Sequence, residues 1–464
     1  EVRTEPRMGN GTRLAVVDGC KKRCPIPESK IEEIVMRRRE VSCVKFISAI
    51  ALVAVFGMLA AAEAADSSRP IAVRNPKSLP SSLPAERIAI GKAYKPSMAL
   101  LPNGDLVIVA LLEDRSDEKL HEWAGLWRSS DSGKSWSDRV RVERTPGQDL
   151  IGREHWLTLI DDGTPDGILF TTCHLLVNDT HNPDDYMHSY VNRSTDGGKT
   201  WTQTRIGPKG WSSPTTNTMA TRNVVEMPDG KLLFGVADFN LPGTEAYVWT
   251  SDDMGVTWQQ SAQLTMPSYT NYQGSAMPFE NLGSFFSESW LYFGTEGELI
   301  NIVRLDRGSP LFSMSANPPS GNDHRDRMLM TTSTDGGMTW NDLKDVGTVS
   351  QECYGQHYSR TTRLDDGRMM MTFTKRGTNT PLGLRAVFSN DDGQTWDFDS
   401  DHIIIDDNTP SGGASGGGFG NTIQLSDGSL ISAYSYPGSA AGIEADIKTE
   451  VVHWSLPQIN SRLG

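Results

Sequence analysis

The chain has 464 residues and a formal net charge of −14, with 37% hydrophobic and 22% charged residues. This is the composition of an ordinary globular protein, and it excludes a disordered or fibrous chain. A protein this acidic repels nucleic acid and anionic membrane surfaces, so we expect no nucleic-acid partner.

The first 64 residues are predicted to lie outside the mature fold. Met36 opens a basic Met-Arg-Arg-Arg segment, an apolar run follows, and a small-x-small cleavage site ends at Ala64. This is the layout of a secretory signal peptide at 36–64, with an apolar part too short for a membrane anchor. We therefore expect a secreted or periplasmic protein with no membrane span after cleavage. Residues 1–35 show no strand pattern and are expected to add nothing to the fold.

Cysteine usage indicates neither a disulfide scaffold nor a cysteine metal site. Three of the five cysteines precede Ala64, which leaves Cys173 and Cys353. These two either form one bridge or are two buried small hydrophobic residues. The sequence also holds no phosphate loop and no dinucleotide fingerprint, so we expect no cofactor.

One octapeptide, Ser-x-Asp-x-Gly-x-Ser/Thr-Trp, occurs five times along the chain. The copies lie at 129–136, 194–201, 251–258, 333–340 and 389–396. The Asp side chain accepts backbone N–H bonds within a tight turn, and the Gly adopts a positive φ. The Trp begins the next strand and offers a large apolar surface to bury between sheets. We therefore interpret the five aspartates as turn formers rather than catalytic carboxylates: Asp131, Asp196, Asp253, Asp335 and Asp391.

A second hairpin motif comes before each octapeptide. Its turns are marked by Asn103-Gly104, Asp162-Gly163, Asp229-Gly230, Asp366-Gly367 and Asp427-Gly428. The fourth unit lacks such an Asn-Gly or Asp-Gly dipeptide, and we expect its strand–turn–strand within 282–293. Each unit is thus two hairpins, and the sixth has 451–454 in place of its octapeptide. Six four-stranded units predict an all-β, six-bladed β-propeller with antiparallel blades over 93–457, after a lead-in at 65–92.

Hairpin parity predicts which face of the propeller carries function. The short Gly turns and the octapeptides fall on one face, whereas the long polar loops and the links between blades fall on the other. Long loops are where function tends to lie. Carboxylates, arginines, histidines and aromatic residues are expected to converge there, a mixture that suits a sugar site.

The octapeptide closely resembles the Asp-box repeat of the sialidase superfamily, and the resemblance extends from about Ala93 to Pro457. It implies an exo-acting glycoside hydrolase that cleaves terminal sialic acid, or a similar anionic sugar, from extracellular glycans. Three arginines of the family grip the substrate carboxylate, and a tyrosine activated by a glutamate attacks the anomeric carbon. An aspartic acid serves as acid and base. We expect a glycan substrate, no metal and a monomer.

The resemblance implies four candidate catalytic residues. Tyr358 is the nucleophile, because the segment from Tyr358 to Gly367 has the family's Tyr-Ser-x-x-x-x-Leu-x-Asp-Gly spacing. It lies in the fifth blade, whereas the sixth has Phe419 at the corresponding place. Asp114 or Asp117 is the acid/base, and Glu280 is the activator of the tyrosine.

The resemblance also implies six candidate substrate-binding residues. Lys95 stands where the family has the first arginine, within an Arg-Ile-Pro motif. It replaces the two-pronged guanidinium of that arginine with the single charge of an ammonium group. The full set is Arg115, Arg222, Arg360, Arg376, Lys95 and Arg153.

Two other functions remain open. The first is a propeller glycosidase or lyase acting on a uronic-acid polysaccharide, which Phe419 and the missing Arg-Ile-Pro motif favour. Asp179, His181 and His188 would supply acid–base chemistry or bind a metal in such an enzyme. The second is a non-catalytic propeller that binds glycans, because the fold alone does not determine the function.

Overall fold

The structure of the chain is a computed structural model. It describes residues 69–114, 121–182, 186–206, 217–238, 246–265, 267–270, 276–277, 285–286, 288–305, 327–346, 356–375, 383–407, 418–437 and 447–457. Regular structure within these ranges is entirely β. No helix among them is long and apolar enough to cross a membrane. The predicted signal segment and the residues before it lie outside the described ranges.

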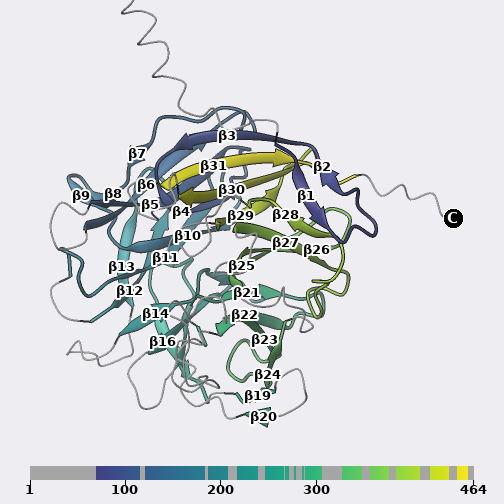
Figure 1. Cartoon of the computed structure of the whole chain (residues 1–464). Coiled ribbons are helices and arrows are strands. Elements are labelled where there is room, and N and C mark those ends of the chain that lie inside the picture. The colour runs from purple at the N-terminus through teal and green to yellow at the C-terminus, as the bar shows by residue number, and fades with distance from the viewer. Residues whose placement is uncertain are drawn as a thin grey trace, which may run out of the picture. The chain divides into compact units, whose positions relative to one another are not determined.

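Six sheets follow one another along the chain as the blades of a β-propeller, as the sequence predicts (Figure 1). Their strands pair antiparallel, except for one parallel pair at the outer edge of blade 4. The first two blades have four strands each, paired in chain order. Blade 1 consists of β4 (Tyr94–Leu100), β5 (Leu106–Asp114), β6 (His121–Ser129) and β7 (Val140–Arg141). Blade 2 consists of β10 (Arg153–Ile160), β11 (Ile168–Leu175), β12 (His188–Ser194) and β13 (Thr202–Ile206). A ribbon of β8 (Glu143–Thr145) and β9 (Gln148–Asp149) lies between them in the chain.

Blades 3 and 4 depart from the four-strand pattern. The innermost strand of blade 3 is broken into two short segments that both pair with β16. Blade 3 consists of β14 (Thr218–Ala220), β15 (Val225–Glu226), β16 (Leu232–Asp238), β17 (Ala246–Ser251) and β18 (Gln259–Gln263). Blade 4 gains two outer strands and consists of β19 (Tyr269–Thr270), β20 (Ala276–Met277), β21 (Trp290–Phe293), β22 (Leu299–Leu305), β23 (Arg327–Ser333) and β24 (Leu343–Asp345).

Strands from before residue 93 complete the last two blades. Blade 5 consists of β25 (Gln356–Arg363), β26 (Met369–Lys375), β27 (Gly383–Ser389), β28 (His402–Ile404), β1 (Ile71–Arg74) and β2 (Ser82–Leu83). Blade 6 consists of β29 (Phe419–Gln424), β30 (Leu430–Pro437), β31 (Ile447–Trp454) and β3 (Ala85–Gly91). The purple β3 runs antiparallel beside the yellow β31 in Figure 1, so strands from opposite parts of the chain share one blade.

The first hairpin of blade 4 lies later in the chain than the sequence analysis predicts. Its strands are β21 and β22, and its turn is formed by Glu296 and Gly297, not by residues within 282–293. Gly297 has a φ of 83°, so it plays the part of the other turn glycines. The prediction was wrong because Phe285 and Phe286 gave that segment a strand-like apolar character. Both side chains are instead fully buried in the core between blades 3 and 4.

The octapeptide aspartates form turns, as predicted. In the first copy, Asp131 Oδ1 accepts the Ser135 N–H at 2.9 Å, and Oδ2 accepts the Ser135 hydroxyl at 2.5 Å. Ser129 Oγ accepts the Gly133 N–H at 2.9 Å, and the Trp136 indole donates to the Gly133 carbonyl at 3.0 Å. The corresponding Asp-to-Ser/Thr pairs recur in the other four copies. The aspartates are therefore occupied by local bonds.

Hydrophobic clusters occupy the contacts between neighbouring blades. Trp201 packs between blades 1 and 2, and Trp396 packs between blades 4 and 5. The remaining pairs of neighbours, including blades 6 and 1, have clusters of the same kind. Another cluster joins four different blades through Tyr94, Leu111, Trp156, Tyr358 and Phe419.

Cys173 carries a free and buried thiol in β11. Burial raises the pKa of this thiol to about 12, against the lowering effect of the Asn192 side chain. The thiol therefore stays protonated and acts as a small hydrophobic group. Cys353 lies outside the described residues.

Candidate functional site

The candidate site is built from one repeated position on the innermost strand of several blades. That position lies nine residues before the turn glycine of the first hairpin. It is occupied by Lys95, Glu154, Glu288, Tyr358 and Phe419 in blades 1, 2, 4, 5 and 6. Because the turns lie at the far end of the strands, these residues share the opposite face, on which function was expected.

Four of these five residues have a left-handed backbone. The φ angles are 51° for Lys95, 68° for Glu154, 49° for Glu288 and 56° for Tyr358. The strand pairing shifts register at Lys95, Glu154 and Tyr358, which is the mark of a β-bulge. A bulge bends the strand and re-aims a side chain. Non-glycine residues with positive φ cost about 1 kcal/mol or more each, and such strain concentrates at functional sites.

Tyr358 lies among three cations and is 3% exposed. The centroid of its ring is 3.7 Å from Arg222 Cζ, 5.0 Å from Lys95 Nζ and 5.6 Å from Arg304 Cζ. Its phenolic oxygen accepts a long hydrogen bond of 3.4 Å from Arg304 Nη1. The phenol also donates to the carboxylate of Glu288.

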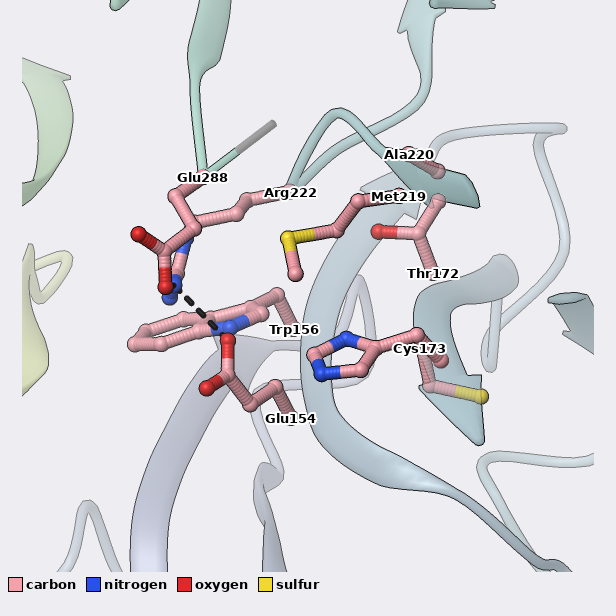
Figure 2. A pocket seen from close by; sticks show the side chains of 9 residues that line it. Glu154, Trp156, Thr172, Cys173, Met219, Ala220, Arg222 and Glu288 are labelled. Atoms are coloured by element: carbon pink, nitrogen blue, oxygen red, sulfur yellow. Dashed lines mark hydrogen bonds and ion pairs between the residues drawn. The ribbon is translucent and has the colours of Figure 1, made fainter. Parts of the chain in front are cut away.

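Two carboxylates alternate with the cations. Arg222 Nη2 lies 2.8 Å from Glu154 Oε2 and 3.2 Å from Glu288 Oε1 (Figure 2). The other oxygen of Glu154 pairs with Lys95, and the other oxygen of Glu288 pairs with Arg304. The cluster of Lys95, Glu154, Arg222, Glu288 and Arg304 thus has three positive and two negative groups. It carries a local positive excess in a protein whose net charge is negative.

The same contacts set the ionisation of the cluster. Burial acts to raise the pKa of Glu288, but Arg304, Arg222 and Lys95 outweigh it and hold that pKa well below its usual range. Burial lowers the pKa of Arg222 to about 10, although Glu288 and Tyr358 oppose the shift. Burial also lowers the pKa of Arg360 to about 10. At neutral pH both arginines stay protonated, and Glu288 stays ionised.

A small cavity of about 10 Å³, the space of about one water molecule, lies beside this cluster. Figure 2 shows Arg222 over the Trp156 ring, with Glu154 and Glu288 on either side of the guanidinium. Burial, then the cations Arg153 and Lys95, lower the pKa of His174 to about 3, so this residue of the wall is neutral. The cavity is lined by Glu154, Trp156, Thr172, Cys173, His174, Met219, Ala220, Arg222 and Glu288.

The structure brings some of the predicted site residues together and separates others. Tyr358, Arg222 and Lys95 meet at the cluster. Arg360 is buried in β25, two residues after Tyr358. It donates to Ser97 Oγ at 3.0 Å and lies over the Trp290 ring. Arg153 pairs with the buried Glu122.

Five predicted residues have side chains outside the described part of the chain. Asp114 is the last residue of β5, but its side chain is not described. The others are Arg115, Asp117, Glu280 and Arg376.

The sequence analysis gave no catalytic or binding role to three residues of the cluster: Glu154, Glu288 and Arg304. A signal for the first two was present, because they share with Tyr358 the nine-residue spacing to a turn glycine. In blade 4 the spacing could not be recognised, because the sequence analysis predicted the turn of that blade before Gly297. Arg304 belongs to β22, a second strand, and carries no comparable signal.

The trio of Asp179, His181 and His188 is divided in the structure. His181 Nδ1 lies 2.8 Å from Asp179 Oδ1. His188 is instead buried at the start of β12, with its Nδ1 2.7 Å from Arg205 Nη2.

Comparisons with known proteins agree with this fold. The sequence model of the BNR repeat-like domain family matches residues 124–442. A protein of unknown function from Dyadobacter fermentans is similar in structure, with 19% identity, a TM-score of 0.54 and coverage of 83% of this chain and 98% of that one. The NanB sialidase of Streptococcus pneumoniae is similar at 12% identity and a TM-score of 0.50, over 86% of this chain and 72% of that one.

Sequence similarity to a curated protein is confined to a short segment. A xyloglucanase from Paenibacillus is 29% identical over 165 residues. This segment is 32% of the present chain and only 14% of the xyloglucanase.

Proposed function

Because this chain belongs to the BNR repeat-like domain family, we propose that it is an exo-acting glycoside hydrolase of the sialidase type. It removes a terminal anionic sugar, sialic acid or one similar to it, from glycans. The observation that carries the proposal is the hydrogen-bonded pair of Tyr358 and Glu288 among Arg222, Arg304 and Lys95. A tyrosine nucleophile suits a sugar whose carboxylate would repel an attacking carboxylate.

The cations of the cluster bind the substrate carboxylate. Arg222 and Arg304 present guanidinium groups, which match a carboxylate with two parallel N–H bonds. In the free protein these groups are held by Glu154 and Glu288, so the site is pre-organised and its charges are paired. The local positive excess favours entry of one further anion despite the acidity of the whole chain.

Tyr358 then attacks the anomeric carbon. Its Oη forms the new bond, its proton passes to Glu288, and the glycosidic oxygen leaves with a proton from a carboxylic acid. We propose Asp114 or Asp117 for that acid, the two candidates that the resemblance implies. Water afterwards hydrolyses the tyrosyl–sugar bond. A substrate carboxylate bound by Arg222 and Arg304 weakens their pull on Glu288, which raises its pKa and makes it a better base.

A second candidate function rests on the two carboxylates. Glu154 and Glu288 each have an oxygen bound to Arg222 Nη2, so these oxygens are at most about 6 Å apart. Carboxyl groups about 5–5.5 Å apart serve as nucleophile and acid/base in retaining glycosidases, and wider pairs serve inverting ones. This reading makes Glu154 catalytic and Tyr358 a binding residue, and it suits a uronic-acid or neutral substrate.

Release of the fluorophore from an aryl α-sialoside tests both candidates. We expect turnover by the wild type and a loss of at least about 100-fold in kcat for Tyr358→Phe, as for removal of an essential group. Tyr292→Phe is the matched control, because the Tyr292 hydroxyl donates to the Gly393 carbonyl of the fifth octapeptide, on the opposite face of the propeller.

Two outcomes would contradict the sialidase proposal. One is a wild type that is folded by circular dichroism yet inactive on the sialoside, which would turn the search to aryl uronides. The other is an active Tyr358→Phe variant together with an inactive Glu154→Gln variant. That pair of results would establish the two-carboxylate mechanism.

We propose further that the protein is exported, with the signal segment 36–64 as support. Mass spectrometry of protein recovered from outside the cytoplasm should give Ala65 as the first residue. An intact segment 36–64 on exported protein would contradict cleavage.

A further inference from the structure

Three metal-ligating side chains meet at the junction of blades 1 and 2, apart from the cavity. His121 begins β6, Asp149 ends β9, and His181 lies in the loop after β11. One ligand atom from each lies within 4.8 Å of the other two. The two imidazole ring centroids are 4.4 Å apart, and His121 Nε2 is 3.9 Å from Asp149 Oδ2.

The inner nitrogen of each imidazole is already fixed by an oxygen. His181 Nδ1 lies 2.8 Å from Asp179 Oδ1, and His121 Nδ1 lies 2.8 Å from Thr180 Oγ1. Asp179 is 2% exposed and is itself held by the backbone N–H groups of His181 and Glu122. Metal-binding histidines almost always use their second nitrogen in this way, which fixes the tautomer and the ring orientation. Among the described residues, the Nε2 atoms of both rings make no hydrogen bond.

We propose that His121 Nε2, His181 Nε2 and Asp149 Oδ2 bind one Zn²⁺ ion. Two imidazoles and a carboxylate are a common set of three protein ligands for zinc, with the fourth position left for water or another ligand. Calcium and magnesium prefer sets made only of oxygens, so the imidazoles favour zinc. Zinc bonds of about 2.0–2.2 Å require the three atoms to approach one another by about 1 Å. The side chains are partly exposed, which allows that movement.

Arg141 is compatible with this ion. It pairs with both oxygens of Asp149 in the free protein and also lies over the Trp123 ring, with Cζ 4.4 Å from the centroid. When Asp149 Oδ2 binds the metal, the Arg141 guanidinium can remain paired with Asp149 Oδ1. It then orients the metal-bound carboxylate, as a second layer of contacts commonly does.

The ion would fix three separate segments on the functional face. It joins the start of β6, the β8–β9 ribbon and the loop after β11. The next residue in β6, Glu122, pairs with Arg153, which adjoins Glu154 of the central cluster. A zinc ion here therefore fixes the rim of the candidate active site where blades 1 and 2 meet.

Isothermal titration of the metal-free chain with ZnCl₂ tests the proposal. We expect one equivalent to bind, and binding to weaken at least 10-fold in His121→Ala and in His181→Ala. Asp179→Asn should weaken binding by about 10–100-fold, as is usual for contacts behind a ligand. His453→Ala is the matched control: this partly buried histidine of blade 6 bonds only to the Gly133 carbonyl among the described residues, and its removal should leave zinc affinity unchanged.

A thermal measurement gives an independent readout. Zinc should raise the Tm of the wild type and of His453→Ala, but not that of Asp149→Asn, an isosteric change chosen because it disturbs the fold least. Equal zinc affinity in the wild type and the His121→Ala/His181→Ala double variant would overturn the proposal. So would stoichiometric binding of CaCl₂ without binding of ZnCl₂.

Discussion

The guanidinium of Arg222 in blade 3 lies 3.7 Å from the ring centroid of Tyr358 in blade 5. A cation this close to an aromatic ring is attracted by its electron-rich face. The same guanidinium also pairs with Glu154 and Glu288. One arginine thus holds the phenol and both carboxylates of the candidate site in a single arrangement.

Arg222→Met should lower the stability of the protein as well as its activity. The change leaves Glu154 and Glu288 largely buried with one cation fewer, and breaking a buried ion pair costs about 3–5 kcal/mol. Urea denaturation should show this loss in the free energy of unfolding. Lys231→Met, which removes a half-exposed lysine from a surface pair, should cost less than about 1 kcal/mol. Equal costs for the two variants would show that the cluster does not depend on Arg222.

Gly255→Ala should be more destabilising than Gly230→Ala, although the two glycines share a left-handed backbone with φ of 80° and 84°. A left-handed non-glycine residue costs about 1–2 kcal/mol, and both variants bear that cost. A Cβ at Gly255 would also lie 2.3 Å from the Phe170 ring, whereas a Cβ at Gly230 meets nothing within 4 Å. Overpacking adds about 1–3 kcal/mol. Chemical denaturation midpoints of the two variants measure the difference, and identical midpoints would exclude the packing effect.

Stability should fall in acid because of the octapeptide aspartates. Bonds from the Ser135 and Thr257 hydroxyls and N–H groups, and from Ser129 and Ser251, lower the pKa values of Asp131 and Asp253 to about 2. The unfolded value is about 3.9, so these groups stabilise the fold fully above about pH 4. That contribution is lost as the pH falls from about 4 to about 2. The Tm of an Asp131→Asn/Asp253→Asn variant should therefore vary less with pH across this window than that of the wild type; parallel curves would contradict the assignment.

Arg87→Met should weaken the closure of blade 6. Arg87 in β3 donates to Glu450 at 3.0 Å and to the Tyr434 hydroxyl at 2.7 Å, and its other Nη donates to the Ile405 carbonyl of blade 5 at 2.8 Å. Removing the guanidinium from beside the buried Glu450 should cost about 3–5 kcal/mol in urea denaturation. Arg87→Met/Glu450→Gln should recover part of that loss, because it removes the uncompensated charge. A double variant as unstable as the sum of the two single variants would argue against this pair.

Sequence alone was sufficient where the determining contacts are local. Each octapeptide closes its turn through bonds between residues two to four positions apart, so its pattern predicts its structure in all five copies. The turn glycines act in the same local way, and repetition of the two motifs predicts six antiparallel blades. The resemblance to the Asp-box repeat added Tyr358 and Arg222, which do lie in the cluster.

Only the tertiary structure decided which residues meet. Lys95 reaches Glu154 across 59 residues, and Arg222 reaches Glu154 across 68. His121, a proposed zinc ligand, and Asp179, which holds the proposed ligand His181, likewise come from different blades. β3 joins β31 only because the ring closes, with Arg87 and Glu450 separated by 363 residues. Such contacts depend on how the blades pack and where the inner strands bulge, and no pattern within one blade encodes them.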